Sequence, residues 1–333
     1  MDRIVLKIIE QTRSGEHLSR DEIAWLLSFP EESPESLLVV KEAKRLAWER
    51  CRGRAFVHAQ IGLDSLPCPE NCRYCSFAQV NDSNSRECSV IDMDALLDFA
   101  RLFSQEGANL ISLMSTAALP FEKLLSFVAA ARLVIDDHVI LLVNGPDLSL
   151  EQAIELREVG ADAAYHAVRL GEGYLTDLDP RKRVQTIENI QAAGLALMSG
   201  VEPLWRNAPE DELLDAIERQ IALRPVWTGC CSLTIAENCS IHGLEPASRL
   251  RARQVGAIIR LAAGSRIPVG GVGGVAWVDA GTDPRMRGKS SHHESLRRDM
   301  RETRSALEKD GWLVAGQDES WAYCLRGVKP SAW

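Results

Sequence analysis

The sequence contains no long apolar run. Nowhere among its 333 residues is there a stretch of about 18 consecutive apolar residues, the length that a membrane-spanning helix needs, and the first residues are charged. A secretory signal would need an apolar segment near that start. We therefore expect neither a membrane span nor a secretory signal.

Basic residues do not outnumber acidic ones. The chain has 38 Lys and Arg against 47 Asp and Glu, which gives a formal net charge of −9 at pH 7. A surface that binds nucleic acid is usually built from an excess of Lys and Arg. No nucleic-acid partner is expected.

Low-complexity linkers are also missing. The length would allow two ordinary domains, but a (β/α)8 barrel takes about 250 residues as one domain. The apolar content of 46% is enough for a large core. Nine cysteines, an odd number with uneven spacing, indicate reduced thiols and metal ligands rather than a disulfide framework. We expect a cytoplasmic protein.

Three of these cysteines are concentrated between Pro67 and Phe77. Cys68, Cys72 and Cys75 lie within eight residues, so one loop can turn their thiols towards a single centre. Structural zinc takes four closed ligands, and catalytic zinc usually includes His or a carboxylate. A [4Fe–4S] cube with one open iron needs only three thiolates. With no fourth cysteine nearby, the loop favours the cube over an incomplete zinc knuckle or an unliganded thiol cluster.

Short apolar runs alternate with amphipathic stretches along most of the chain. The candidate strands are residues 55–61, 109–115, 139–144, 161–168, 196–201, 226–233, 266–270 and 274–280. The candidate helices are residues 91–106, 121–134, 149–159, 181–193, 210–223, 247–263 and 294–309. This alternation predicts an α/β fold, a (β/α)8 TIM-type barrel that is full or nearly full. The cysteine loop follows the first strand, where the site of such a barrel belongs.

The first part of the chain departs from this pattern. Residues 1–52 predict an N-terminal helical extension, because no glycine occurs between Gly15 and residue 50 and Ser19 stands three residues before Glu22 as a capping signal. Residues 53–333 are then the barrel with a C-terminal helical segment.

The spacing C-x3-C-x2-C, with Tyr74 directly before the last cysteine, resembles the signature of radical S-adenosylmethionine (SAM) enzymes. Residues 201–203 and 278–285 resemble the biotin synthase-like branch of that superfamily. Within this branch the chain is most similar to methylornithine synthase of pyrrolysine biosynthesis. The radical SAM proteins of hydrogenase cofactor assembly are nearly as similar.

The resemblance implies cofactors, partners and a reaction. Cys68, Cys72 and Cys75 would hold a [4Fe–4S] cluster whose open iron binds SAM. The enzyme would take hydrogen from a small-molecule substrate and need an external electron donor such as flavodoxin or ferredoxin. The chain departs from biotin synthase itself, since the positions of that enzyme's auxiliary-cluster ligands hold Leu113 or Met114, Val143, Met198, and Gly270 or Gly271. Sulfur insertion by that route is not expected.

The resemblance also implies a set of SAM contacts. Besides Tyr74, these are Ser115 and Thr116 in place of the usual glycine-rich motif, Arg169, Glu172, Arg183 and Glu202. Glu172 and Arg183 best match the pair that holds the amino acid part of SAM. A surface arginine and a solvated loop carboxylate are the alternatives for these two residues.

His166 and Asp279 are the candidate catalytic residues. His166 follows the fourth strand, with a packed interior histidine as the alternative. Asp279 lies on the last strand, ahead of Asp283 and Arg285. Groups of both signs would suit a zwitterionic substrate such as an amino acid, although a salt bridge that closes the barrel explains them equally.

The remaining cysteines leave a second metal site open. Adjacent residues on a strand point to opposite faces, so only one of Cys230 and Cys231 can face the barrel. Together with Cys239, His242 or Cys324 it would hold a second cluster, against the alternative of free buried thiols. The pair His292–His293 is expected to be exposed to solvent.

Three classes of function stay open at this stage. The first is a radical SAM mutase or rearrangement enzyme. The second is a cofactor-assembly enzyme with sulfur or second-cluster chemistry. The third is an iron–sulfur carrier that never cleaves SAM.

Overall fold

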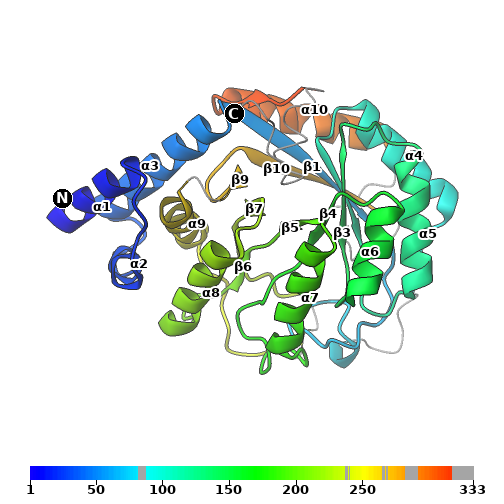
Figure 1. The fold of residues 1–333 in the computed structure, drawn as a ribbon, viewed down its shortest axis with the longest axis horizontal. Coiled ribbons are helices and arrows are strands. Elements are labelled where there is room, and N and C mark those ends of the chain that lie inside the picture. Colours follow the sequence, from blue (N-terminus) through cyan, green and yellow to red (C-terminus); the bar gives the residue numbers. More distant parts are fainter. Residues whose placement is uncertain are drawn as a thin grey trace.

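The computed structural model describes residues 1–81, 88–236, 239, 241–264, 267, 269–281 and 292–316. Parallel strands in these ranges form one curled sheet with helices on its outer side (Figure 1). In their order of pairing they are β10 (Val275–Ala280), β1 (Arg54–Gly62), β2 (Leu110–Met114), β3 (Ile140–Asn144), β4 (Ala163–Tyr165), β5 (Ala196–Met198), β7 (Trp227–Thr228) and β9 (Val269–Gly270).

The barrel is nearly full rather than closed. Between described residues no hydrogen-bonded ladder joins β9 to β10, the two ends of the sheet. A further short strand, β11 (Leu313–Val314), pairs with the start of β1. The predicted α/β fold and TIM-type barrel are confirmed. The predicted residues Arg266, Asp283, Arg285 and Cys324 lie outside the described residues.

The side chains of strand β1 alternate between the outer and the inner face of the sheet. Val57, Ala59 and Ile61 are 0% exposed and pack against the outer helices. The alternate residues His58 and Gln60 turn to the barrel interior, because side chains on a strand change face at every residue. A parallel sheet is covered by helices on its outer face, which explains the nearly continuous apolar runs.

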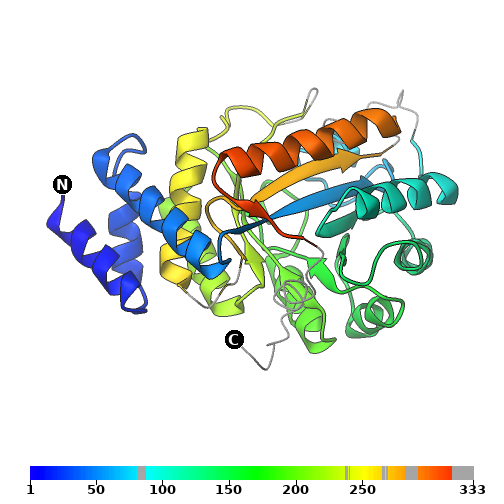
Figure 2. The same cartoon turned by 90° about the horizontal axis from the view of Figure 1, so that it is seen from above.

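The outer layer consists of the predicted helices, whose ends differ from the prediction by a couple of residues at most. They are α4 (Met93–Gln105), α5 (Phe121–Arg132), α6 (Leu150–Glu158), α7 (Pro180–Ala192), α8 (Glu210–Leu223), α9 (Arg249–Ala263) and α10 (His293–Lys309). Helix α10 runs along β10 and β1, which lie side by side (Figure 2). Among the described helices, not one combines the length and the apolar composition that crossing a bilayer requires.

Three helices precede the barrel: α1 (Arg3–Arg13), α2 (Arg20–Leu27) and α3 (Pro34–Arg50). The predicted capping box of Ser19 and Glu22 opens α2. Apolar residues of all three helices, among them Ile8 and Ile23, share a buried cluster with Ile258 of α9. The division of the chain after residue 52 stays a prediction.

Two of the predicted strands each break into two pieces. Residues 196–201 form β5 and the start of β6 (Val201–Leu204), and residues 226–233 form β7 and β8 (Cys230–Ser232). Strands β6 and β8 pair with each other in a separate two-stranded sheet. The breaks fall at Gly200 and Gly229, which lie so close that a Cβ atom on Gly200 would be 3.3 Å from the carbonyl oxygen of Gly229. This second sheet carries Glu202 and Cys230.

Candidate functional site

The cysteine loop lies between β1 and α4 and is stabilised by hydrogen bonds within the loop. The amide of Cys68 donates to the carbonyl oxygen of Phe77 at 2.6 Å, and the amide of Cys75 donates to that of Cys72 at 2.8 Å. The side-chain amide of Asn81 donates to the carbonyl oxygens of Arg73 and Cys75, both at 2.9 Å. Asn81 is buried, so it braces the loop from behind.

The thiols of Cys68, Cys72 and Cys75 are half-buried and free of disulfides. Burial raises the pKa of the Cys68 thiol and raises the pKa of Cys72 to about 11. A bound metal centre reverses this preference, because it binds the thiolate. Among the described residues no three His, Cys, Asp or Glu side chains are placed to hold a single metal ion. A [4Fe–4S] cube offers each thiolate its own iron, so three separate soft ligands on one loop fit it.

The cysteine loop docks on the segment that follows β4. The amide of Arg73 donates to the carbonyl oxygen of Leu175, and the amide of Asp177 donates to that of Glu70, each at 3.0 Å. The side chain of Asn71 donates to the Asp177 carboxylate at 2.8 Å. The cysteines are thereby fixed relative to the loop that carries Arg169 and Glu172.

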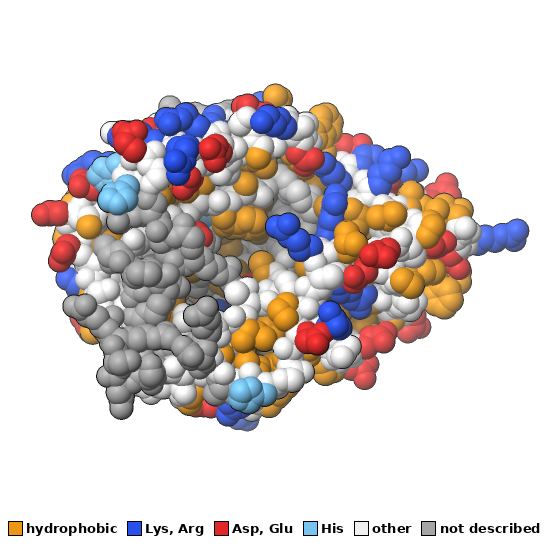
Figure 3. Space-filling model, turned by 180° about the vertical axis from the view of Figure 1, so that it is seen from behind, with side chains coloured by type: hydrophobic (Ala, Val, Ile, Leu, Met, Phe, Trp, Pro, Cys, Tyr) orange, Lys and Arg blue, Asp and Glu red, His pale blue; other side chains and the backbone are white. Residues whose placement is uncertain are grey.

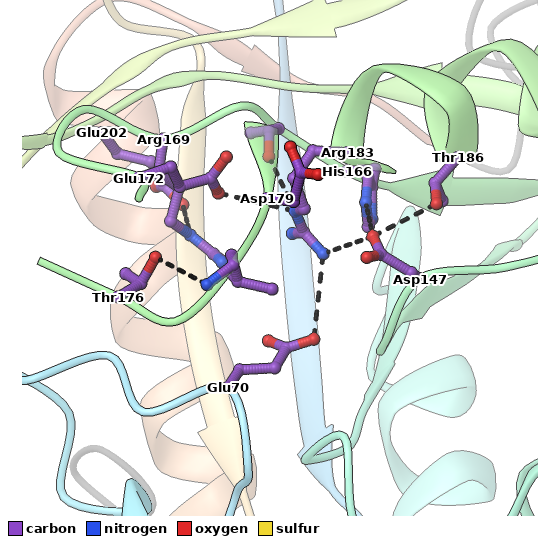
Figure 4. Close-up of polar contacts among 12 residues, drawn as sticks. Glu70, Asp147, His166, Arg169, Glu172, Thr176, Asp179, Arg183, Thr186 and Glu202 are labelled. Carbon is purple, nitrogen blue, oxygen red and sulfur yellow. Dashed lines mark hydrogen bonds and ion pairs between the residues drawn. The ribbon is translucent and has the colours of Figure 1, made fainter. Parts of the chain in front are cut away.

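Beneath this junction lies a cluster of charged residues around Arg183 (Figure 4). Its Nη1 donates to Oδ1 of Asp147 at 2.9 Å, and its Nε donates to the carbonyl oxygen of Ala167 at 3.3 Å. The carboxylates of Glu172 and Glu70 lie 3.5 Å and 4.0 Å from the guanidinium. The arginine side chain is 2% exposed, so the alternative of a surface arginine is wrong.

Asp147, which the sequence did not single out, is the hub of this cluster. It accepts hydrogen bonds from Nε2 of His166 at 2.9 Å and from the hydroxyl of Thr186 at 3.1 Å, besides that from Arg183. Burial alone would raise the pKa of Asp147, but the hydrogen bond from His166 and the charge of Arg183 outweigh it and lower the pKa to about 2.

The ring of His166 is buried and hydrogen-bonded to this aspartate. Its side chain is 1% exposed, and burial lowers its pKa to about 4, so the ring is neutral at pH 7. The geometry favours the alternative of a packed interior histidine. The catalytic role predicted for His166 stays a prediction.

Acidic groups outnumber basic ones in this cluster. Glu70, Asp147 and Glu172 surround the single guanidinium of Arg183. Burial raises the pKa of both Glu70 and Glu172, and neither carboxylate oxygen of Glu172 accepts a hydrogen bond from the described part of the chain. A positively charged ligand group, such as the ammonium or sulfonium of SAM, would balance these carboxylates.

A more open ion pair lies beside the buried cluster. Nε of Arg169 is 3.5 Å from Oε1 of Glu202, and the two side chains are 21% and 24% exposed. The hydroxyl of Tyr165 is buried near Glu202, and burial followed by the charge of this carboxylate raises the pKa of that hydroxyl well above the usual value. Burial also raises the pKa of Tyr74. Arg169 and Glu202, unlike Arg183, are open to a ligand.

The two hydroxyl residues after β2 differ in their surroundings. Thr116 donates to the carboxylate of Asp64 through its amide at 2.9 Å and through its hydroxyl at 2.6 Å, and so ties the ends of β1 and β2 together. The hydroxyl of Ser115 is buried without a hydrogen-bond partner among the described residues. Buried polar groups usually have such partners, so Ser115 suits a polar ligand better than Thr116 does.

The remaining candidates come from strands β8 and β10 and from the start of α10. Asp279 is on the interior face of β10, next to Gln60 of β1. Cys230 is half-buried with a pKa raised well above the usual value by burial, whereas Cys231 is exposed, as opposite faces require. His292 and His293 are exposed, as predicted.

Comparison with known proteins assigns the class. Residues 67–219, which hold the cysteine loop and the charged cluster, match the family described as "Radical SAM superfamily". Over these residues the chain is therefore similar to radical SAM domains. The cofactors of this superfamily are a [4Fe–4S] cluster and SAM, and its members similar to this chain are enzymes.

The curated relatives show which branch of the superfamily the chain is similar to. Biotin synthase of Mycobacterium leprae (strain Br4923) is 27% identical over 192 residues, which cover 56% of this chain and 55% of that protein. Biotin synthase of Geobacillus kaustophilus (strain HTA426) is 27% identical over 202 residues, 59% of this chain and 60% of that protein. The chain thus spans little more than half the length of these relatives. The predicted similarity to the biotin synthase-like branch is confirmed.

Solved structures show the same fold. Methylornithine synthase PylB superposes with a TM-score of 0.77 at 13% identity, over 93% of this chain and 98% of PylB. The hydrogenase maturase HydG from Carboxydothermus hydrogenoformans gives 0.67 at 18% identity, over 90% of this chain and 68% of HydG. These are the two groups that the sequence pointed to, and at such identities the likeness concerns the fold alone.

Proposed function

We propose that this protein is a radical SAM enzyme that reductively cleaves SAM and removes hydrogen from a small, amino-acid-like substrate in the barrel, in a mutase or rearrangement reaction. The observation that carries the proposal is the junction between the cysteine loop and the charged cluster of Glu70, Asp147, Glu172 and Arg183. It puts three free thiols next to buried groups that complement a charged cofactor.

The residues of the chain have distinct parts in this function. Cys68, Cys72 and Cys75 hold the cluster, which when bound supplies the electron that splits SAM into methionine and a 5′-deoxyadenosyl radical. Glu172 and Arg183 orient the amino acid part of SAM, with Nε and Nη1 of the guanidinium already fixed by Ala167 and Asp147. The sheet and its helices exclude water and oxygen from the substrate.

Asp279 is the proposed substrate contact. It lies on the interior face of β10 among residues that face the barrel. An external electron donor such as flavodoxin or ferredoxin would dock near the cysteine loop. The thiols of Cys68, Cys72 and Cys75 form no disulfide, which suits the reducing cytoplasm that we propose as the site of action.

A cofactor-assembly enzyme with a second cluster is the alternative. Cys230 favours it, because this half-buried thiol lies within electrostatic reach of Glu202 near the barrel interior. Iron counting decides: one cluster gives about four irons per chain and two cubes give about eight.

The decisive test is SAM cleavage by anaerobically reconstituted protein. Reduced wild-type protein should bind about four irons per chain and release 5′-deoxyadenosine from SAM. Cys72→Ala should lose the cluster and the product, while Cys88→Ala, which alters an exposed cysteine outside residues 67–77, should keep both. A Cys72→Ala protein with a normal cluster would refute the assignment of Cys68, Cys72 and Cys75 as cluster ligands. Wild-type protein that binds the cluster but never cleaves SAM would favour the alternative of an iron–sulfur carrier.

A further inference from the structure

The loop that carries Arg169 and Glu172 turns tightly between β4 and α7. Gly171 and Gly173, on either side of Glu172, have positive φ angles of 81° and 89°. The amide of Leu175 donates to the carbonyl oxygen of Gly171 at 2.7 Å, and a Cβ atom on Gly171 would lie 2.4 Å from Cδ1 of Leu175. Glycine leaves the backbone free to adopt other conformations as well. The loop therefore depends on contacts with its surroundings to hold Glu172 in one place.

The carboxylate of Glu172 is not fixed by hydrogen bonds of its own. Neither of its oxygens accepts a hydrogen bond from the described part of the chain, and one of them lies 3.5 Å from Nε of Arg183. Its direction is therefore set by the backbone of the loop. Figure 3 shows a hollow near the centre of the molecule with hydrophobic side chains in its depth. A largely apolar pocket orients its ligand through a few polar groups, so the position of each of them matters.

Glu212 holds this loop from the first turn of α8. Its Oε1 accepts a hydrogen bond from the amide of Gly171, and its Oε2 accepts one from the hydroxyl of Tyr174 at 2.7 Å. Burial and then the hydrogen bond to Glu212 raise the pKa of Tyr174, so the hydroxyl keeps the proton that it donates. Hydrogen bonds to an ionised carboxylate are about twice as strong as those between neutral groups. One carboxylate thus binds the chain on both sides of Glu172.

Tyr174 also connects this contact to the cysteine loop. Its carbonyl oxygen accepts a hydrogen bond from Nη1 of Arg73, which stands between Cys72 and Cys75 in the sequence. Its hydroxyl is bound by Glu212 at the same time. Helix α8 is therefore linked through one tyrosine to the backbone that carries the proposed cluster ligands.

We propose that Glu212 is a positioning residue for SAM, which acts through Gly171 and Tyr174 to keep the Glu172 carboxylate beside Arg183. This inference rests on the proposed function, in which Glu172 and Arg183 orient the amino acid part of SAM. It adds a residue of an outer helix to that site. Glu212 then matters for ligands that carry the amino acid group and not for ligands that lack it.

The experiment uses anaerobic, cluster-loaded protein without a reductant, so that SAM binds but is not cleaved. Equilibrium dialysis measures the dissociation constants of radiolabelled SAM and of radiolabelled 5′-deoxyadenosine, which lacks the amino acid part. Glu212→Ala should weaken SAM binding roughly fivefold and leave 5′-deoxyadenosine binding within about twofold of the wild type. Glu212→Gln should lose less, because its amide oxygen still accepts a hydrogen bond from Gly171. Tyr174→Phe keeps the Gly171 contact and should also lose less.

A double-mutant cycle tests whether Glu212 acts through Glu172. Glu172→Ala removes the carboxylate that Glu212 is proposed to position. In that background Glu212→Ala should change the SAM dissociation constant by less than about twofold, because residues that act as one unit are not additive. Glu210→Ala is the matched control, since Glu210 stands in the same first turn of α8 and is exposed. It should bind both ligands as the wild type does.

The proposal is overturned if Glu212→Ala binds SAM as Glu210→Ala does or if it weakens SAM and 5′-deoxyadenosine equally. It is also overturned if the full effect of Glu212→Ala persists in the Glu172→Ala background. Urea titrations report whether each variant is folded, and if Glu212→Ala is not, Glu212→Gln and Tyr174→Phe serve for the same comparisons. Wild-type protein that binds SAM but does not cleave it when reduced would refute the proposed function and leave the positioning role of Glu212 intact.

Discussion

Arg183 and Asp147 form an ion pair inside the protein, with Nη1 of the arginine donating to Oδ1 of the aspartate at 2.9 Å. Asp147 follows β3 and Arg183 stands in the first turn of α7, so the pair joins two βα units that lie 36 residues apart in the sequence. Removal of one partner from a buried pair leaves the other charge uncompensated, at a cost of about 3–5 kcal/mol.

Arg183→Ala should therefore lower the free energy of unfolding by about 3–5 kcal/mol in a urea titration. SAM affinity should fall roughly tenfold or more, because a charge-assisted contact contributes about 1.5–3 kcal/mol. Arg183→Lys keeps the charge but not the planar fork, and intermediate losses are expected.

Arg181→Ala is the control for this prediction. Arg181 lies on the same first turn of α7, and its side chain is 91% exposed. A surface pair of this kind contributes little to stability. Equal stability and equal SAM affinity in the two alanine variants would show that Arg183 neither stabilises the fold through Asp147 nor binds SAM.

The burial of His166 gives the protein a defined acid response. The pKa of His166 is about 4 in the folded protein against its ordinary 6.5, because burial disfavours the charged ring. The unfolded chain thus takes up the proton first, and stability falls as the pH drops from 6.5 towards 4. At pH 5.5 the loss from this residue is about 1.4 kcal/mol.

His166→Asn should remove this part of the pH dependence, since the amide can still donate to Asp147 but does not titrate. Urea titrations at pH 7.5 and 5.5 measure the difference for each protein. His242→Asn, at an exposed position, should behave like the wild type. A His166→Asn protein with the full acid loss would assign the response to other groups.

Much of the fold was predictable because its signals are local. The alternation of apolar runs and amphipathic helices gave the strand and helix positions, and the cysteine spacing gave the superfamily. The breaks at Gly200 and Gly229 were not predicted, because the apolar pattern runs through them and the change of sheet depends on contacts between distant segments.

The charged cluster was predictable only in part. Arg183 and Glu172 were found by position, but Asp147 was missed because a single aspartate after a strand looks like any loop residue. Its importance arises from three donors that come from β4 and α7.

Asn81 offers a test of how the cysteine loop is held. Its side-chain amide donates to the carbonyl oxygens of Arg73 and Cys75. Asn81→Ala removes both hydrogen bonds and leaves two carbonyl oxygens without them, at about 1 kcal/mol each. The cluster should then be lost to an iron chelator faster by roughly tenfold, the equivalent of about 1.4 kcal/mol.

The measurement is the decay of cluster absorbance in the presence of chelator, under anaerobic conditions. Asn189→Ala is the matched control, because the Asn189 side chain also donates to a backbone carbonyl, that of Leu148 at 2.8 Å, but away from the cysteine loop. Wild type and Asn189→Ala should decay at the same rate. A cluster decay rate in Asn81→Ala equal to that of the wild type would contradict the role of Asn81. The backbone hydrogen bonds of the loop and its contacts with the segment after β4, which remain in this variant, would then hold the loop in place.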